Sequence, residues 1–423
     1  MRIGPQAGIL NRPPEHQLVA ALAFVGERSR QPCVDTLEAL RTVLRRELHS
    51  DIDSPDATTD KGQPFVETGE LGFQDGFDRG HLTVTVSFSA SAMDALEVPA
   101  ALRPQDLVAA PWDALGIAPA VPAAGDVLVQ ICTDSPYVAE HVLRRIEHSL
   151  DGRMQVVWCV AGDQRFTSRS GRVNAGEARA LNGFLDGTAN LDPAQSDDDY
   201  ALVFIDPDVV AAYPSNPPAG QQPQSAYGPN NNPVFPPLRD KPTFEPPWTR
   251  DGTYLFVQAI VLEVTGWDKT SLTDQEHAVG RYKVSGTALD LPDDPSHRND
   301  TPAYAANPSD ETVPVDSHIR KSNPRGPEDA LRRIYRRGYP LMIADGSGAM
   351  RRGLLFESFS RSTSTQVEFI LRAWMLNPDF PRPSAGKDKL IAFFSATLCG
   401  GYYFAPPLDH SRDPSSWRIP ATT

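Results

Sequence analysis

The sequence predicts an α+β fold of two ferredoxin-like modules, each with the element order β-α-β-β-α-β and an antiparallel sheet. Short strand-like segments alternate with stretches of helical spacing, the same order of elements occurs twice, and a proline-rich stretch separates the two halves. The chain has 423 residues, 40% of them hydrophobic, which is enough for two domains with separate cores. We expect domains at residues 1–200 and 251–423, with a surface insertion at 201–250.

Six elements between Gln17 and Phe166 are expected to form the first module. Apolar runs or strict alternation of apolar and polar residues predict the strands, and apolar residues three or four positions apart predict the helices. The predicted strands are residues 18–24, 81–89, 126–132 and 154–160. The predicted helices are residues 34–48 and 135–150, and the second begins with Ser135 as a suitable N-cap and a proline at the first helical position.

The same order is expected in the second half. Its predicted strands are residues 253–264, 341–344, 354–359 and 389–397, and its predicted helices are residues 274–282 and 364–376. Residues 285–337 are then an insertion between the first helix and the second strand. Two small sheets joined in this way are expected to leave a cleft between them, a usual place for a cofactor. Residues 208–248 contain eleven prolines and are expected to be irregular.

The composition excludes several classes of partner. A net charge of −14 argues against nucleic acid and against an anionic membrane surface. No segment approaches the ~20 consecutive apolar residues of a membrane helix. The four cysteines form no C-x-x-C pair, so a structural zinc site is not expected, and free thiols fit a reducing compartment. The first residues show neither a secretory signal nor a twin-arginine pair, so we expect a cytoplasmic protein.

Two motifs stand out as candidates for chemistry. His318 lies in a stretch that concentrates positive charge in an acidic chain: Arg320, Lys321, Arg325, Arg332, Arg333, Arg336 and Arg337. Such clusters usually face an anion or an oxygen-rich ligand. The second motif, G-F-L-D-G at 183–187, holds Asp186 between two glycines that allow a tight loop. Alone, an Asp-Gly pair is more often only a turn, and a histidine more often a surface or core residue.

Together, G-x-x-D-G at 183–187, H-I-R-x-x-N-P-R from His318 and R-R-G from Arg336 resemble the dye-decolorizing peroxidase family of haem enzymes. The resemblance extends over nearly the whole chain, including Q-A-G-I near the start and D-V-L-V-Q-I-C at 126–132. It implies one haem b per chain, bound in a cleft of the C-terminal half with His318 as the proximal iron ligand. The absence of C-x-x-C-H means that this haem is held non-covalently.

The resemblance also assigns roles. Asp186 is expected to move the proton of bound hydrogen peroxide, and Arg336, rather than Arg337, to stabilise the charge that grows as the O–O bond breaks. Arg332, Arg333 and Arg337 are then surface charges or salt-bridge partners. The other ring N–H of His318 needs a carboxylate acceptor, for which Glu368 is our candidate. Otherwise Glu368 is an exposed helix residue.

Further haem contacts follow from the resemblance. They are Gly187, Thr188, Ala189, Asn323, Pro324 and Arg325 around the haem edge, with Leu355 and Phe356 as the apolar distal wall. Arg325 could pair with a propionate, and the two apolar residues could equally be core. The sequence departs from the family pattern at Gln258, where many members carry arginine, so a haem contact from that strand is in doubt.

The implied activity is a peroxidase that reduces hydrogen peroxide and oxidises bulky aromatic donors, such as dyes and phenols, by one-electron steps through a ferryl intermediate. Exposed Tyr or Trp side chains could relay electrons; Tyr335, Tyr339 and Trp374 are candidates, although structural roles are commoner. The alternative is a haem-handling, deferrochelatase-like protein with weak peroxidase activity, and a third reading is a haem-free α+β protein. Besides peroxide and aromatic donors we expect neither nucleic acid nor membrane as partner. Whether the protein forms a homo-oligomer stays open. Residues 408–423 lack an apolar peptide that could dock the protein inside a shell compartment, which argues against packaging of this kind.

Overall fold

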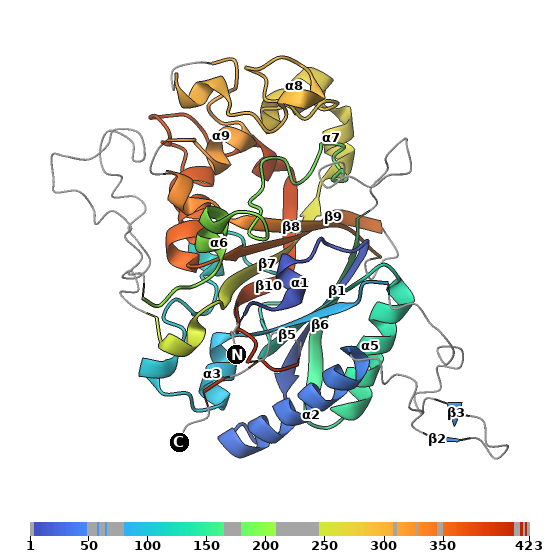
Figure 1. Cartoon of the computed structure of the whole chain (residues 1–423). Coiled ribbons are helices and arrows are strands. Elements are labelled where there is room, and N and C mark those ends of the chain that lie inside the picture. The colour runs from blue at the N-terminus through green and yellow to red at the C-terminus, as the bar shows by residue number, and fades with distance from the viewer. Residues whose placement is uncertain are drawn as a thin grey trace.

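Eight strands form one antiparallel sheet in the computed structural model, in the order β6-β1-β5-β4-β10-β7-β9-β8 (Figure 1). The structure describes residues 4–48, 57–58, 64–65, 80–164, 179–208, 245–307, 311–326, 329–344, 350–409, 415–417 and 419–420. Each half of the chain supplies four neighbouring strands. In both halves their spatial order is fourth, first, third, second, which confirms the ferredoxin-like fold class.

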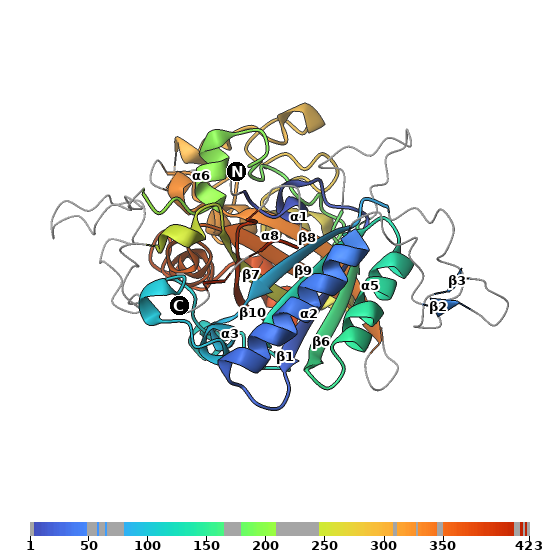
Figure 2. The same cartoon turned by 60° about the horizontal axis from the view of Figure 1, so that its bottom comes forward.

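The N-terminal half matches its predicted elements closely. Its strands are β1 (His16–Phe24), β4 (Thr83–Phe88), β5 (Val127–Thr133) and β6 (Met154–Asp163). Its long helices are α2 (Arg30–Leu48) and α5 (Pro136–Ser149), and its shorter elements are α1 (Ala7–Leu10), α3 (Ala90–Ala95), η2 (Ala100–Leu102) and α4 (Trp112–Leu115). A separate small sheet pairs β2 (Ala57–Thr58) with β3 (Pro64–Phe65). Figure 2 shows α2 and α5 side by side over this half of the large sheet, where they bury an apolar core.

The C-terminal half carries more helical turns than predicted. Its strands are β7 (Thr253–Leu262), β8 (Tyr335–Ala344), β9 (Met350–Ser360) and β10 (Phe394–Ala405). Its α-helices are α7 (Val264–Lys269), α8 (Leu272–Val279) and α9 (His318–Ser322), and α6 (Asp197–Val203) precedes it. The 3₁₀ turns are η3 (Pro247–Thr249), η4 (Pro295–His297), η5 (Ala303–Ala305), η6 (Asp329–Arg332) and η9 (Lys389–Phe393); η7 (Thr363–Val367) and η8 (Ile370–Met375) are π-helical.

Three predicted elements of this half need correction. The last strand begins at Phe394 rather than at residue 389, because Lys389–Phe393 forms the 3₁₀ turn η9. The helix predicted to reach residue 282 ends at Val279, where Gly280 takes a left-handed φ of 89°. Strand β8 begins at Tyr335, so that Arg336 and its neighbour lie in the sheet rather than in an insertion. Pro340 argues against a strand in the sequence because proline has no N–H to donate, but an edge strand tolerates it.

The prediction of two separate sheets with a cleft between them is wrong, because the strands of both halves belong to one sheet. The halves join where β10 pairs with β4, at Phe404 and Phe88. The two ends of the strand order also approach each other: a Cβ on Gly162 of β6 would lie 2.6 Å from Cβ of Tyr339 on β8. The sheet therefore curves round on itself, and the space that it encloses is filled by a hydrophobic core with residues from both halves. A site for a cofactor therefore has to lie on an outer face of the sheet.

Part of the predicted organisation lies outside the described residues. The proline-rich insertion falls mostly on residues 209–244, which the structure does not describe. Its irregular character and the domain boundaries at 200 and 250 therefore stay predictions. Within the described ranges, no helix combines the length and the apolar character needed to cross a lipid bilayer.

Candidate active site

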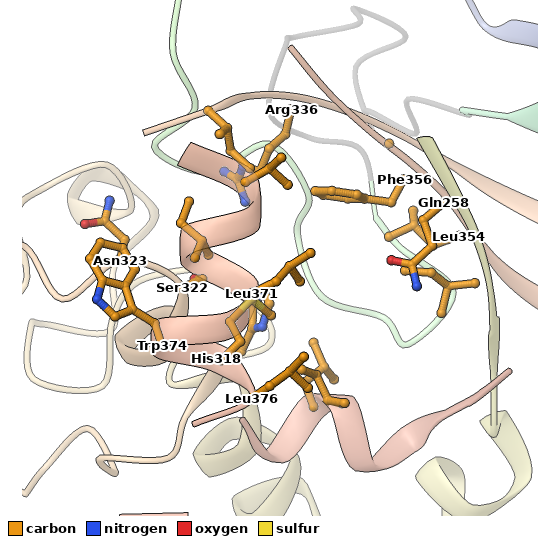
Figure 3. Close-up of a pocket in the computed structure, with 18 of the residues that line it drawn as sticks. Gln258, His318, Ser322, Asn323, Arg336, Leu354, Phe356, Leu371, Trp374 and Leu376 are labelled. Carbon is orange, nitrogen blue, oxygen red and sulfur yellow. The ribbon is translucent and has the colours of Figure 1, made fainter. Parts of the chain in front are cut away.

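A cavity of about 910 Å³ lies on the outer face of the C-terminal half. Strands β7, β8 and β9 form one wall, and α9 and η8 the other; the loops at 113–118 and 180–189 complete its rim. Figure 3 shows His318 and Leu371 on one side of this space, and Phe356, Leu354 and Gln258 on the other. Its volume is at the upper end of the range of roughly 300–1,000 Å³ that is usual for cofactor pockets.

His318 is the first residue of α9 and lines the cavity. Its Nδ1 lies 2.7 Å from Oδ2 of Asp388, a carboxylate with no exposed surface. The other oxygen of Asp388 accepts the main-chain N–H of Leu390 at 2.9 Å. Because Nδ1 is engaged in this bond, Nε2 is the ring nitrogen left to bind a metal.

The predicted partner of His318, Glu368, is therefore replaced by Asp388. Glu368 is buried between η7 and η8, and its charge acts on Arg372. Asp388 lies 70 residues beyond His318, just before a 3₁₀ turn. No regular spacing in the sequence connects the two residues, so only the folded chain identifies the pair.

The loop with Asp186 has the predicted tight geometry. Gly183 and Gly187 take left-handed φ angles of 89° and 71°, and Oδ1 of Asp186 accepts the N–H of Gly187 at 2.7 Å. A Cβ on Gly187 would meet open space, so its backbone conformation, rather than crowding, favours glycine there. Asp186 lines the cavity, and its Oδ2 is 3.0 Å from the place of a Cβ on Gly338. The glycine of R-R-G thus makes room for this carboxylate.

Arg336 lines the cavity from strand β8 and is joined to the same loop. Its Nη2 donates to the carbonyl oxygen of Thr188 at 2.9 Å. Its main-chain N–H donates to Oδ1 of Asn190 at 3.0 Å, and Nδ2 of Asn190 donates back to its carbonyl at 2.7 Å. Burial lowers the pKa of the Arg336 guanidinium, and the charge of Asp186 opposes that shift. The two motifs, about 150 residues apart, therefore meet at one side of the cavity.

Arg337 points to the opposite face of the sheet, because side chains alternate along a strand. It is buried, its Nη1 donates to the carbonyls of Gly8 and Ile9, and the charge of Glu357 acts on it. The expectation of a surface charge at Arg337 is wrong. The Arg337 side chain lies on the inner face of the sheet, whereas the cavity that Arg336 lines is on the outer face.

The seven cations near His318 in sequence do not form one cluster. Those that line the cavity are Arg325, Arg332, Arg333 and Arg336. Arg333 pairs with Asp199 at 3.4 Å, as expected, whereas Arg332 is buried with its guanidinium 3.4 Å from the ring centroid of Phe369. The other three are buried away from the cavity: Arg320, Lys321 and Arg337.

Most of the other predicted contacts line the cavity, namely Gly187, Thr188, Ala189, Asn323, Arg325 and Phe356. Pro324 and Leu355 do not. Leu355 is fully buried in the core inside the sheet, and its neighbours Leu354 and Phe356 face the cavity instead. Of the two residues predicted for the wall on β9, Phe356 lines the cavity and Leu355 does not. Gln258, whose contact was in doubt, lines the cavity and donates to Oγ1 of Thr397 at 2.8 Å.

The proposed electron-relay residues are all buried. Tyr335 is 8% exposed, Tyr339 0% and Trp374 1%, so none is the exposed side chain that the hypothesis required. Tyr339 donates to the carbonyl of Pro14 inside the core, whereas Trp374 lines the cavity. Structural roles account for the two tyrosines.

Positive charge at the cavity suits carboxylates of a ligand. Arg281, which the sequence reasoning missed, lines it together with Arg325 and Arg336. Burial, with a smaller contribution from Arg325, lowers the pKa of Arg281 to about 10. Nε of Arg325 is buried and has no hydrogen-bond partner within the described part of the chain. Anionic groups placed here would relieve the repulsion among these arginines.

The chain is similar to known proteins over nearly its whole length. The family model "Dyp-type peroxidase, N-terminal" matches residues 12–164, and "Dyp-type peroxidase, C-terminal" matches residues 232–410. A relative named deferrochelatase from Shigella flexneri serotype 5b is 30% identical over 410 residues, which cover 95% of this chain and 82% of the relative.

Two solved structures share the fold. The Dyp-type peroxidase from Cellulomonas bogoriensis matches with a TM-score of 0.66 and 23% identity, over 98% of this chain and 93% of that one. DtpA from Streptomyces lividans matches with a TM-score of 0.68 and 21% identity, over 95% and 92%. On the family models and the identity to the curated relative, this chain belongs to the Dyp-type peroxidase family, a family of oxidoreductases that act on peroxide.

Proposed function

We propose that this protein is a haem b peroxidase that reduces hydrogen peroxide and oxidises bulky aromatic donors, such as dyes and phenols, by one-electron steps. The observation that carries the proposal is the meeting of Asp186 and Arg336 at one side of a cavity that His318 also lines. A carboxylate and a guanidinium at one side of a cavity, with an imidazole bonded through Nδ1 on its wall, are groups suited to proton transfer and charge stabilisation in the cleavage of a peroxide.

The residues present fit a haem. His318 would bind the iron through Nε2, while Leu354, Phe356 and Leu371 would contact the porphyrin ring. Arg281 and Arg325 would pair with the propionates, which gives the unpartnered Nε of Arg325 an acceptor. When bound, the haem supplies an iron that coordinates peroxide and exchanges electrons. We propose one non-covalent haem per chain.

Asp186 and Arg336 then have separate tasks. The carboxylate of Asp186 would accept a proton from one oxygen of hydrogen peroxide and return it to the other oxygen, which leaves as water. The guanidinium of Arg336 donates hydrogen bonds to the oxygen on which negative charge develops. The hydrogen bonds of Arg336 to the loop at 188–190 fix this donor before peroxide arrives.

A second candidate function is haem handling, in which the protein stores haem or releases iron from it. The deferrochelatase name of the curated relatives favours it. A protein that only holds haem has no need of a carboxylate and a guanidinium together at the cavity, so we rank the peroxidase first.

One experiment separates the two. The apo-protein is reconstituted with haem and mixed with peroxide, and the visible spectrum is followed together with oxidation of a phenol or dye. The variants Asp186→Ala and Arg336→Ala should bind haem normally and react with peroxide about 10²–10³-fold more slowly. Unchanged rates in both variants would overturn the assigned roles, and appearance of iron-free porphyrin without donor oxidation would favour haem handling.

We further propose a cytoplasmic location. All four cysteines are free, and burial raises the pKa of both Cys132 and Cys399 to about 12. Thiols of this kind are unreactive and fit a reducing compartment.

A further inference from the structure

Strand β8 is the last strand in the order of the sheet, and at Arg336 its outer edge lies beside the loop that carries Asp186. An edge strand leaves main-chain N–H and C=O groups without a neighbouring strand. At Arg336 both groups are bonded to the side chain of Asn190, which takes the place of that neighbour. We propose that Asn190 is a positioning residue for the peroxidase reaction and sets the place of Arg336 at the cavity. This inference rests on the proposed function.

The carboxamide of Asn190 is suited to this task. It carries one acceptor and one donor group side by side, as a peptide does. Oδ1 accepts the N–H of Arg336 at 3.0 Å, and Nδ2 donates to its carbonyl at 2.7 Å. Aspartate could make the first of these bonds but not the second, and alanine could make neither. The pair of bonds therefore specifies asparagine.

The same loop also holds the side chain of Arg336, through the bond from its Nη2 to the carbonyl of Thr188 at 2.9 Å. Asp186 belongs to this loop, and its carboxylate lies against Gly338, two residues beyond Arg336. Asn190 thus joins the strand to the loop at the point where the carboxylate and the guanidinium meet. Loss of its two bonds would let the loop and the strand shift against each other, and a shift of about 1 Å at such a site can cost ~10²-fold in rate.

The chain offers a matched control in Asn299. Oδ1 of Asn299 accepts the N–H of Ala189 at 3.0 Å, so this residue anchors the same loop. No bond between Asn299 and Arg336 occurs among the described residues. Asn299→Ala therefore reports the effect of loosening the loop alone.

The test compares Asn190→Ala, Asn190→Asp, Asn299→Ala and Arg336→Ala after reconstitution with haem. Three quantities are measured: the rate of reaction with peroxide, the dissociation constant for fluoride, and haem affinity together with melting temperature. Fluoride binds ferric haem and accepts hydrogen bonds from nearby donors, so its affinity reports the position of Arg336 without turnover. Asn190→Ala should slow the peroxide reaction and weaken fluoride binding by about 10–100-fold, with Asn190→Asp between it and the wild type. Haem affinity and melting temperature should match those of Asn299→Ala.

Positioning through Arg336 also predicts non-additivity, so that Asn190→Ala in the Arg336→Ala background should cause no further loss. The inference is overturned if Asn190→Ala and Asn299→Ala change peroxide rate and fluoride binding equally, or if the losses in the double variant add. If Asn190→Ala alone proves unstable, Asn190→Asp decides, because it keeps the bond to the Arg336 N–H. If Arg336→Ala itself leaves peroxide rate and fluoride binding unchanged, the proposed function fails instead.

Discussion

Asp388 accepts a hydrogen bond from Nδ1 of His318 at 2.7 Å, from a position with no exposed surface. The main-chain N–H of Leu390 bonds the other carboxylate oxygen at 2.9 Å and fixes its orientation. The imidazole is thereby held in one tautomer and one orientation. In a haem peroxidase this arrangement would increase the electron donation of the histidine to the iron.

Replacement of Asp388 tests this relationship. Asp388→Asn keeps an acceptor for Nδ1 but removes the negative charge, so we expect the ferric–ferrous midpoint potential to rise. Asp388→Ala should also weaken haem binding, by about 10–100-fold. Spectroelectrochemistry and titration of the apo-protein with haem measure the two effects. Glu368→Gln is the control, and an equal change of potential in that variant would contradict the assignment of Asp388.

Gly338 is expected to be required beside Asp186. A Cβ at this position would lie 3.0 Å from Oδ2 of Asp186 and 3.2 Å from Cδ1 of Leu354. Gly338→Ala should therefore displace the carboxylate and slow the reaction with peroxide by about tenfold or more, since small misplacements at a reacting centre are costly. Stopped-flow spectroscopy measures the rate. In the Asp186→Ala background the same substitution should have no further effect; a further tenfold loss there would mean that Gly338 acts through something other than Asp186.

Arg337 is expected to affect stability, in contrast to its neighbour Arg336. It is buried beside Glu357 and donates to the carbonyls of Gly8 and Ile9. Arg337→Met leaves these acceptors and the carboxyl group without their cation, which should cost roughly 3–5 kcal/mol of unfolding free energy. Urea denaturation measures this loss. Peroxide reactivity of the folded fraction should stay near that of the wild type, whereas Arg336→Met should show the reverse pattern.

The sequence predicts correctly those elements in which the spacing of apolar residues matches the face that is buried. Strand β5 and helix α5, for example, occupy almost the predicted residues. Strand β8 was missed before residue 341 because Arg336, Arg337 and Pro340 interrupt its apolar alternation, although an edge strand with a polar site on one face accommodates all three.

Within the site, tertiary packing decided what local pattern could not. A run of consecutive apolar residues on β9 does not reveal which of them face the core, and for this reason the sequence predicts Leu355 at the cavity, where the structure places Leu354. Asp388 and Asn190 act through contacts with residues 70 and 146 positions away. No periodicity in the sequence encodes such contacts. The motifs that the sequence reveals are those whose glycines or charged residues lie close together along the chain.

Glu357 is expected to make stability depend on pH. It is fully buried, and its two oxygens accept hydrogen bonds from Nε2 of Gln17 and Nε2 of Gln130, each at 2.8 Å. Burial raises its pKa from 4.5 to about 7, against the opposing effects of these bonds and of Arg337.

Because the folded-state pKa is the higher one, the folded protein binds a proton between pH 4.5 and about 7 that the unfolded chain does not. This stabilisation is complete below pH 4.5 and is lost as pH rises to about 7, a change on the order of 3 kcal/mol. Glu357→Gln cannot lose a proton, so the unfolding free energy of the wild type minus that of the variant should fall by this amount across the window. Urea titrations at several pH values measure it. Glu140→Gln, which removes an exposed carboxylate on α5, should keep the wild-type profile; parallel curves for the wild type and Glu357→Gln would show that Glu357 does not titrate in this range.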